Sequence, residues 1–150
     1  TAAIWHWNVY YHTAIEAAMT CGGAENFVTA MGGSAYYGGL AEGFVGVSPL
    51  NEATVAPGTQ DAIDQVTELI VSGEWDVFTG TKLHITVGED GTVTVEQEEA
   101  PLMSDGLELV DGEVVEAASA EIVPAGGPSV EDSVITGSMN YFVEGVVSAN

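Results

Sequence analysis

A glycine-rich apolar stretch over residues 36–50 constrains the fold of this chain more than any other segment. Two short apolar runs, 36–40 and 44–50, flank the tripeptide at 41–43. Glycine accepts positive φ angles and lets another backbone approach closely, which a larger residue would prevent. The pattern predicts a glycine-rich β segment that lies beneath another layer of the structure.

Hydrophobic periodicity predicts the elements on either side of this stretch. Apolar residues recur at helical spacing near 9–20 and near 60–72, and glycines follow both patterns as natural helix ends. Residues 75–79 are predicted to form a strand. Together these elements predict an α/β fold in which the two helices pack on a sheet that contains 36–50 and 75–79.

The second half of the chain carries the alternating pattern of antiparallel strands. Apolar residues alternate with polar ones on both sides of the turn-forming sequence 88–91, which predicts a β-hairpin. A second hairpin is predicted over 107–117, around Asp111-Gly112. Residues 124–128 are predicted to be a loop, because two prolines and two glycines fall there.

The charge of the chain excludes several classes of partner. It carries 23 acidic residues against one basic residue, Lys82, for a net charge of −22. Nucleic-acid binding needs clustered Lys and Arg, and anionic lipid attracts the same residues, so neither is an expected partner. Salt screens the self-repulsion of so many carboxylates. The composition favours a salt-adapted protein, while an ordinary acidic protein and a specific calcium-binding role remain open.

No known catalytic or metal-binding motif occurs in these 150 residues. The three histidines lack the spacing of metal ligands, and there is no nucleophile elbow, Walker loop or Rossmann fingerprint. The lone Cys21 is predicted to be an inert thiol, and the acidic runs 88–91 and 96–99 to be solvated surface. We therefore expect no enzyme activity, no metal and no cofactor.

The densest aromatic cluster lies at residues 5–11. Aromatic faces in a cleft stack on heterocycles or sugars, while a few polar groups fix the orientation of the ligand. The alternative is that the aromatic rings of this cluster are core residues. The residues predicted to bind a ligand are Trp5, Trp7, Asn8, Tyr10 and, from the glycine-rich stretch, Gly39.

Three stretches carry a family resemblance: the sequence Tyr-Tyr-Gly-Gly-Leu-Ala-Glu-Gly at 36–43 with Val-Ser-Pro-Leu at 47–50, the helix end and following segment at 72–80, and the closing segment 140–147. They resemble the basic membrane protein (PnrA-like) family. These proteins are substrate-binding lipoproteins of ABC importers, and several of them bind purine nucleosides. Where nucleoside-binding relatives place a cleft lysine, this chain has Trp5.

The resemblance implies the C-terminal part of a two-lobed periplasmic-binding-protein-like (type I) fold with an extra β-hairpin region. Residues 1–80 would belong to the solute-binding domain, 81–138 would be a β-rich acidic insertion, and 139–150 would be the closing helix of the domain. The chain opens with Thr1 inside an apolar segment, so we expect a fragment or processed piece whose targeting signal lies upstream.

The function implied by the resemblance is solute binding for an ABC importer. The expected partners are a nucleoside-like or sugar-like small solute and the ABC permease subunits. The expected location is extracytoplasmic, at the cell surface or in the periplasm, with a lipid anchor in a preceding segment and no membrane insertion of these residues. The alternative function is an acidic structural or interaction module of the cell surface that uses 81–138 for its contacts.

Overall fold

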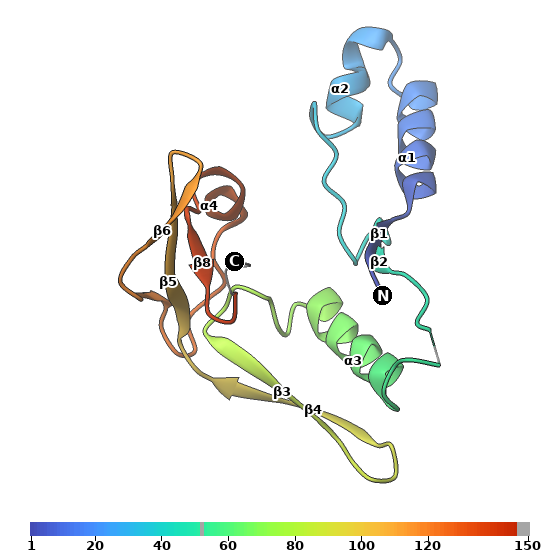
Figure 1. The fold of residues 1–150 in the computed structure, drawn as a ribbon. Coiled ribbons are helices and arrows are strands. Elements are labelled where there is room, and N and C mark those ends of the chain that lie inside the picture. Colours follow the sequence, from blue (N-terminus) through green and yellow to red (C-terminus); the bar gives the residue numbers. More distant parts are fainter. Residues whose placement is uncertain (52, 147–150) are drawn as a thin grey trace. The chain divides into compact units, whose positions relative to one another are not determined.

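The computed structural model describes residues 1–51 and 53–146 and mixes helices with small antiparallel sheets (Figure 1). This confirms the mixed helix and strand content predicted from the periodicity. The chain divides into two compact units, Thr1–Gln60 and Asp61–Asn150, which we call unit 1 and unit 2. The boundary therefore falls after residue 60, whereas the sequence placed one at residue 80.

Unit 1 is built on one short β pair and one long helix. The helix α1 covers Trp7–Thr20, and two short helices follow, η1 at Ala24–Asn26 and α2 at Phe27–Ala30. The strands β1 (Ala3–Trp5) and β2 (Val45–Val47) pair antiparallel.

The prediction of a helix over 9–20 is confirmed, although α1 begins two residues earlier, at Trp7. The helix ends where Cys21 donates its backbone N–H to the Ala17 carbonyl at 2.9 Å. Gly22 follows with a φ of +75°, a conformation that glycine adopts without steric cost. This early start places the aromatic residues of 7–11 on the first turns of a helix.

The predicted β segment over 36–50 is wrong for most of its length. Only Val45–Val47 is a strand, residues 40–43 form a turn, and 36–39 have no regular structure. Gly43 takes a φ of +67°, and Phe44 donates its N–H to the Gly39 carbonyl at 3.0 Å. The glycines therefore close a turn, and they do not fill a buried strand.

Unit 2 contains most of the sheet structure. The predicted helix near 60–72 is confirmed as α3 (Thr59–Ser72), and Gly73, with a φ of +74°, follows its last residue. The strand β5 (Leu102–Val110) pairs antiparallel with three others, namely β6 (Glu113–Glu116), β7 (Glu121–Val123) and β8 (Tyr141–Val143). The last helix, α4, covers Asp132–Gly137.

Both predicted hairpins are present in unit 2. The strands β3 (Thr81–Val87) and β4 (Val93–Glu99) form a separate two-stranded sheet with Ile85 opposite Val95. The β5–β6 hairpin turns at Asp111 and Gly112, whose φ angles are +51° and +85°. Two positive φ angles in a two-residue loop match the twist of the flanking strands, which explains why Asp-Gly predicts this turn.

The predicted strand over 75–79 is wrong. The Trp75 indole Nε1–H donates to the Thr81 carbonyl at 2.8 Å, and the Asp76 carboxylate accepts the Val77 N–H at 2.7 Å. These local bonds hold the segment in turns that lead to Gly80, a buried residue at the start of β3. A short apolar run reads alike in a strand and in such a turn.

The closing helix expected over 139–150 is not seen in the described part of that segment. Tyr141–Val143 is strand β8, which pairs with β5, and Glu144 donates its N–H to the Met103 carbonyl at 2.9 Å. Residues 147–150 lie outside the described residues. Strand β8 therefore joins the sheet around β5, so it lies in the same structural unit as the strands of 81–138.

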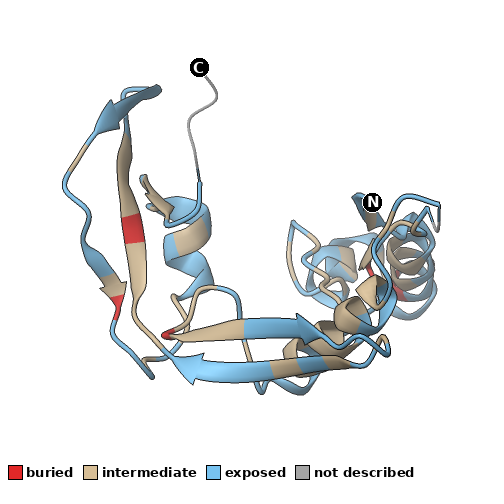
Figure 2. Cartoon of the chain, turned by 60° about the horizontal axis from the view of Figure 1, so that its bottom comes forward, coloured by how far each residue is buried: buried red, intermediate tan, exposed pale blue. Residues whose placement is uncertain are grey.

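Few side chains are buried in either unit (Figure 2). Among the described residues, the buried hydrophobic ones are Ala17, Phe44 and Val123. Large apolar residues on α1 remain exposed, among them Ile15 at 61% and Met19 at 81%. No helix in the described ranges is long and apolar enough to cross a membrane.

Candidate ligand-binding site

An open groove of about 440 Å³ in unit 1 is lined almost entirely by aromatic side chains. We call it the aromatic groove. Its lining residues come from the end of β1, the first turn of α1, the irregular segment before the 40–43 turn, and the residue before β2. They are Trp5, Trp7, Tyr10, Tyr36, Tyr37, Gly38 and Phe44.

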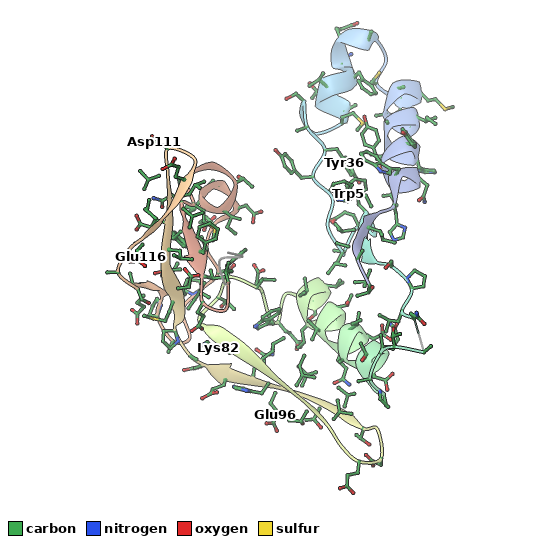
Figure 3. The ribbon with its side chains drawn as sticks, in the orientation of Figure 1. Trp5, Tyr36, Lys82, Glu96, Asp111 and Glu116 are labelled. Carbon is green, nitrogen blue, oxygen red and sulfur yellow. The ribbon has the colours of Figure 1, made fainter. Side chains whose placement is uncertain are left out.

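Backbone pairing between distant segments brings these residues together. Trp5 at the end of β1 lies opposite Val45 at the start of β2. One residue further on, His6 donates its N–H to the Phe44 carbonyl at 2.7 Å. This bond fixes the step from β1 into α1, so that the first turn of the helix faces Phe44 and the segment before it. Figure 3 labels Trp5 and Tyr36, which lie close together beside α1.

Four rings pack against one another in a closed circuit. The ring of Trp7 lies 5.8 Å from Phe44, Phe44 lies 5.1 Å from Tyr36, Tyr36 lies 5.4 Å from Tyr10, and Tyr10 lies 6.2 Å from Trp7. The angles between neighbouring planes are 88°, 84°, 64° and 87° in the same order. Edge-to-face geometry of this kind is the favoured arrangement of aromatic pairs. The four rings form the floor of the groove.

Trp5 and Tyr37 are the most exposed aromatic residues of the lining. Trp5 is 64% exposed and Tyr37 is 87% exposed. The Trp5 ring touches the floor through Trp7, at 6.0 Å and 70°. An aromatic face that is exposed beside a packed aromatic floor is available to stack on a planar or sugar-like molecule.

Gly38 lets the glycine-rich segment approach the floor. A Cβ atom at this position would lie 2.8 Å from the Phe44 Cβ and 2.9 Å from a ring carbon of Tyr36. Such contacts are too short for real atoms, so any larger residue would force Phe44 or the Tyr36 ring to move. The sequence signal for this residue was the paired glycine after Tyr36-Tyr37.

Gly39, which the sequence predicts as a ligand-binding residue, does not line the groove. Its N–H donates to the Glu42 carboxylate at 2.7 Å, and its carbonyl accepts the N–H groups of Phe44 and Val45 at 3.0 and 3.2 Å. The bond from Gly39 lowers the pKa of the Glu42 carboxyl below its ordinary value. Gly39 therefore positions Phe44 through the turn and does not contact the groove.

The structure brings together three of the five predicted residues. Trp5, Trp7 and Tyr10 meet in the groove, whereas Asn8 is exposed on α1 and is not part of the lining. The prediction missed the residues that arrive from the other segment, Tyr36, Tyr37, Gly38 and Phe44. Their signal was present in the glycine-rich stretch, but the pairing of β1 with β2 is what joins the two segments.

The groove lies in the part of the chain with little charge. Four of the 23 acidic residues fall in unit 1, at positions 16, 25, 42 and 52, and the other 19 fall in unit 2 with the single basic residue, Lys82. No Lys, Arg, Asp or Glu lines the groove. Its polar groups are indole N–H and phenol O–H groups.

The other side chains that could bind a metal or react with a ligand make ordinary hydrogen bonds and ion pairs. His84 is exposed, and its Nε2 lies 2.5 Å from the Glu98 carboxylate across the β3–β4 hairpin. The Cys21 thiol donates to the Gly23 carbonyl at 3.2 Å. Within residues 1–51 and 53–146, no group of three or more His, Cys, Asp or Glu side chains is placed to hold a metal ion.

No protein-family model, curated protein or solved structure matches the chain. The resemblance to the basic membrane protein family therefore stays a prediction from the sequence. The functional conclusion depends on the geometry of the aromatic groove.

Proposed function

We propose that the chain is part of a solute-binding protein and that the aromatic groove holds a flat or sugar-like small solute. The observation that carries this proposal is the exposure of Trp5 and Tyr37 beside a floor of four packed rings. Exposed contiguous aromatic surface is costly in water and is characteristic of binding sites. A groove with aromatic walls and a few hydrogen-bonding groups is typical of small-molecule sites.

The finer parts of the proposal are supported by the sequence resemblance. In that interpretation the chain belongs to a two-lobed type I receptor outside the cytoplasm, which delivers its solute to ABC permease subunits. Solutes in such receptors lie between lobes that close about a hinge. The open face of the groove in unit 1 is compatible with such a cleft wall, and Trp5 stands where nucleoside-binding relatives have a lysine.

Two substitutions separate binding from folding. Trp5 contacts one ring of the floor, so Trp5→Ala should leave the fold intact and weaken solute binding about tenfold, as expected for a stacking contribution of about 1 kcal/mol together with lost area. Trp7 contacts the rings of four neighbours, so Trp7→Ala should instead lower the melting temperature. Calorimetry with a panel of nucleosides and sugars, together with thermal melts, measures both effects.

Tyr11→Ala is the matched control. Tyr11 is 58% exposed on α1 and contacts the rings of Tyr10 at 5.5 Å and Trp7 at 6.4 Å, but it does not line the groove. Its removal should leave binding unchanged. If Trp5→Ala unfolds the protein while Trp7→Ala abolishes binding, the two roles are reversed. If no small molecule binds, whether neutral, cationic or anionic, the solute-binding proposal fails. The acidic surface module then becomes the better interpretation.

A further inference from the structure

The aromatic groove offers π-faces to a ligand and offers it no charged partner. Lys and Arg do not occur anywhere in residues 1–60, so an anionic solute would find no opposite charge in unit 1. The chain as a whole carries a net charge of −22, which attracts cations and repels anions over a distance set by the salt concentration. Charge therefore selects against anionic ligands before any contact is made.

Aromatic faces themselves select for cations. The face of an aromatic ring carries partial negative charge, and Trp is the best of the three side chains at attracting a cation placed over it. The Trp5 and Tyr37 faces are exposed, and the floor beneath them is made of rings set edge to face. A cation over Trp5 would also lie near Trp7, whose ring centroid is 6.0 Å from that of Trp5.

The type of cation follows from the missing carboxylates. A primary ammonium group or a metal ion holds its water strongly and needs oxygen ligands in exchange, which the lining does not supply as Asp or Glu. A quaternary ammonium group spreads its charge over methyl groups and gives up little hydration. Such a group fits an aromatic surface, which is apolar and carries a negative electrostatic potential on its ring faces.

We propose that the solute of the aromatic groove carries a compact organic cation of the quaternary ammonium type, held over Trp5 and Tyr37. This inference rests on the proposed solute-binding function and narrows its substrate class. It departs from a neutral nucleoside or sugar, for which the net charge of the protein would be irrelevant.

The test compares two molecules of the same shape. Choline and 3,3-dimethylbutan-1-ol differ in a central nitrogen or carbon atom, so only choline carries the positive charge. Titration calorimetry with the 150-residue chain in dilute buffer should show choline binding at least about tenfold more tightly than its neutral analogue. Added sodium chloride should weaken choline binding and leave the binding of the neutral analogue unchanged, because salt screens only the charged ligand.

Variants at Trp5 distinguish attraction to the ring face from loss of apolar area. Trp5→Phe keeps an aromatic face and should retain more choline affinity than Trp5→Leu, whose side chain is apolar and close to phenylalanine in size but has no π-face. Tyr11→Ala, outside the lining, should bind choline like the unmodified chain.

The outcomes separate this inference from the proposed function. Equal binding of choline and its neutral analogue, or tighter binding of nucleosides and sugars that Trp5→Ala weakens, would overturn the cation inference and leave solute binding intact. Binding to phosphatidylcholine vesicles without binding of free choline would overturn it as well, since a lipid headgroup would then be the ligand. If no ligand of any class binds, both proposals fail.

Discussion

Replacing Gly80 by alanine is the sharpest test of the fold of unit 2. Gly80 donates its N–H to the Gly127 carbonyl at 3.1 Å, and its own carbonyl accepts the N–H groups of Gly126 and Ala100 at 2.7 and 3.1 Å. These three bonds join the start of β3, the end of β4 and the loop at 124–128. A Cβ atom at position 80 would lie 2.0 Å from the Pro124 carbonyl oxygen and 2.6 Å from the Gly127 nitrogen.

The magnitude depends on the atoms that have to move. Both of the nearest atoms belong to the backbone, so no side-chain rotation relieves the contact. An ordinary carbon–oxygen contact is about 3.2 Å or longer, so the loop must shift by about 1 Å, which breaks or stretches the three bonds. Each such bond contributes about 1 kcal/mol, and the overpacking adds about 1–3 kcal/mol, so Gly80→Ala should destabilise unit 2 by about 4–6 kcal/mol. That is a large share of the stability of a small unit.

Urea denaturation followed by circular dichroism measures this loss. Gly137→Ala is the matched control, because the added Cβ at position 137, in α4, meets no atom within 4 Å. The control should unfold at the same urea concentration as the unmodified chain or slightly higher, since alanine is the better helix former by about 1 kcal/mol. Amide signals of Ala100 and Gly126 should shift in Gly80→Ala and stay in place in the control. Equal urea midpoints for the two variants would refute the close backbone contact between Gly80 and the loop at 124–128.

Three further predictions concern charge and backbone conformation. First, the melting temperature should rise from tens of millimolar to molar salt, with the larger gain in unit 2, which holds 19 of the 23 acidic residues; melts that do not change with salt would mean that the carboxylates do not repel one another. Second, the Glu42 carboxyl should titrate below its ordinary pKa, because its charged form accepts the Gly39 N–H. Its stabilising effect on the turn is therefore present above the unfolded pKa and is lost as the pH falls through the lowered value; an NMR titration that finds Glu42 at an ordinary pKa would contradict the bond, and Glu42→Gln should abolish this pH dependence. Third, Asp111→Val should destabilise the β5–β6 hairpin by about 1 kcal/mol, because a β-branched residue tolerates a positive φ poorly, while Asp111→Gly should cost nothing in a urea melt.

The elements that the sequence predicted correctly are those set by local chemistry. The helices α1 and α3 and the two hairpins depend on periodicity and on turn residues a few positions apart, such as Asp111-Gly112. The errors fall at 36–50, 75–79 and 139–150. In the first two segments, turn bonds such as Phe44 N–H to the Gly39 carbonyl and the Trp75 indole N–H to the Thr81 carbonyl replace the expected strands. In the third segment, and at Gly80 beside the second, contacts between distant residues decide the conformation. At Gly80, for example, the deciding partners lie more than 40 positions away, in the loop at 124–128.

In the candidate site too, residues adjacent in sequence could be predicted, and residues brought together by strand pairing could not. Trp5, Trp7 and Tyr10 are neighbours in sequence, so a dense aromatic cluster was enough to single them out. Phe44 and Tyr36 reach them only because β1 pairs with β2 and because His6 bonds to the Phe44 carbonyl. Asn8 was predicted because it lies within the cluster, but a helix turns successive residues by about 100°, so Asn8 points away from the rings on either side of it.

Salt should act on the two properties of this chain in opposite directions, provided that the bound solute is a cation. Screening removes repulsion among the carboxylates, so the free energy of unfolding should rise with salt concentration. The same screening weakens the attraction of the net charge for a cationic solute, so its affinity should fall over the same range. A neutral solute would show the first effect without the second. Measuring stability and choline affinity in one salt series therefore separates the charge of the protein from the chemistry of the aromatic groove. If affinity and stability rise together, apolar burial governs binding and the cationic class of solute is excluded.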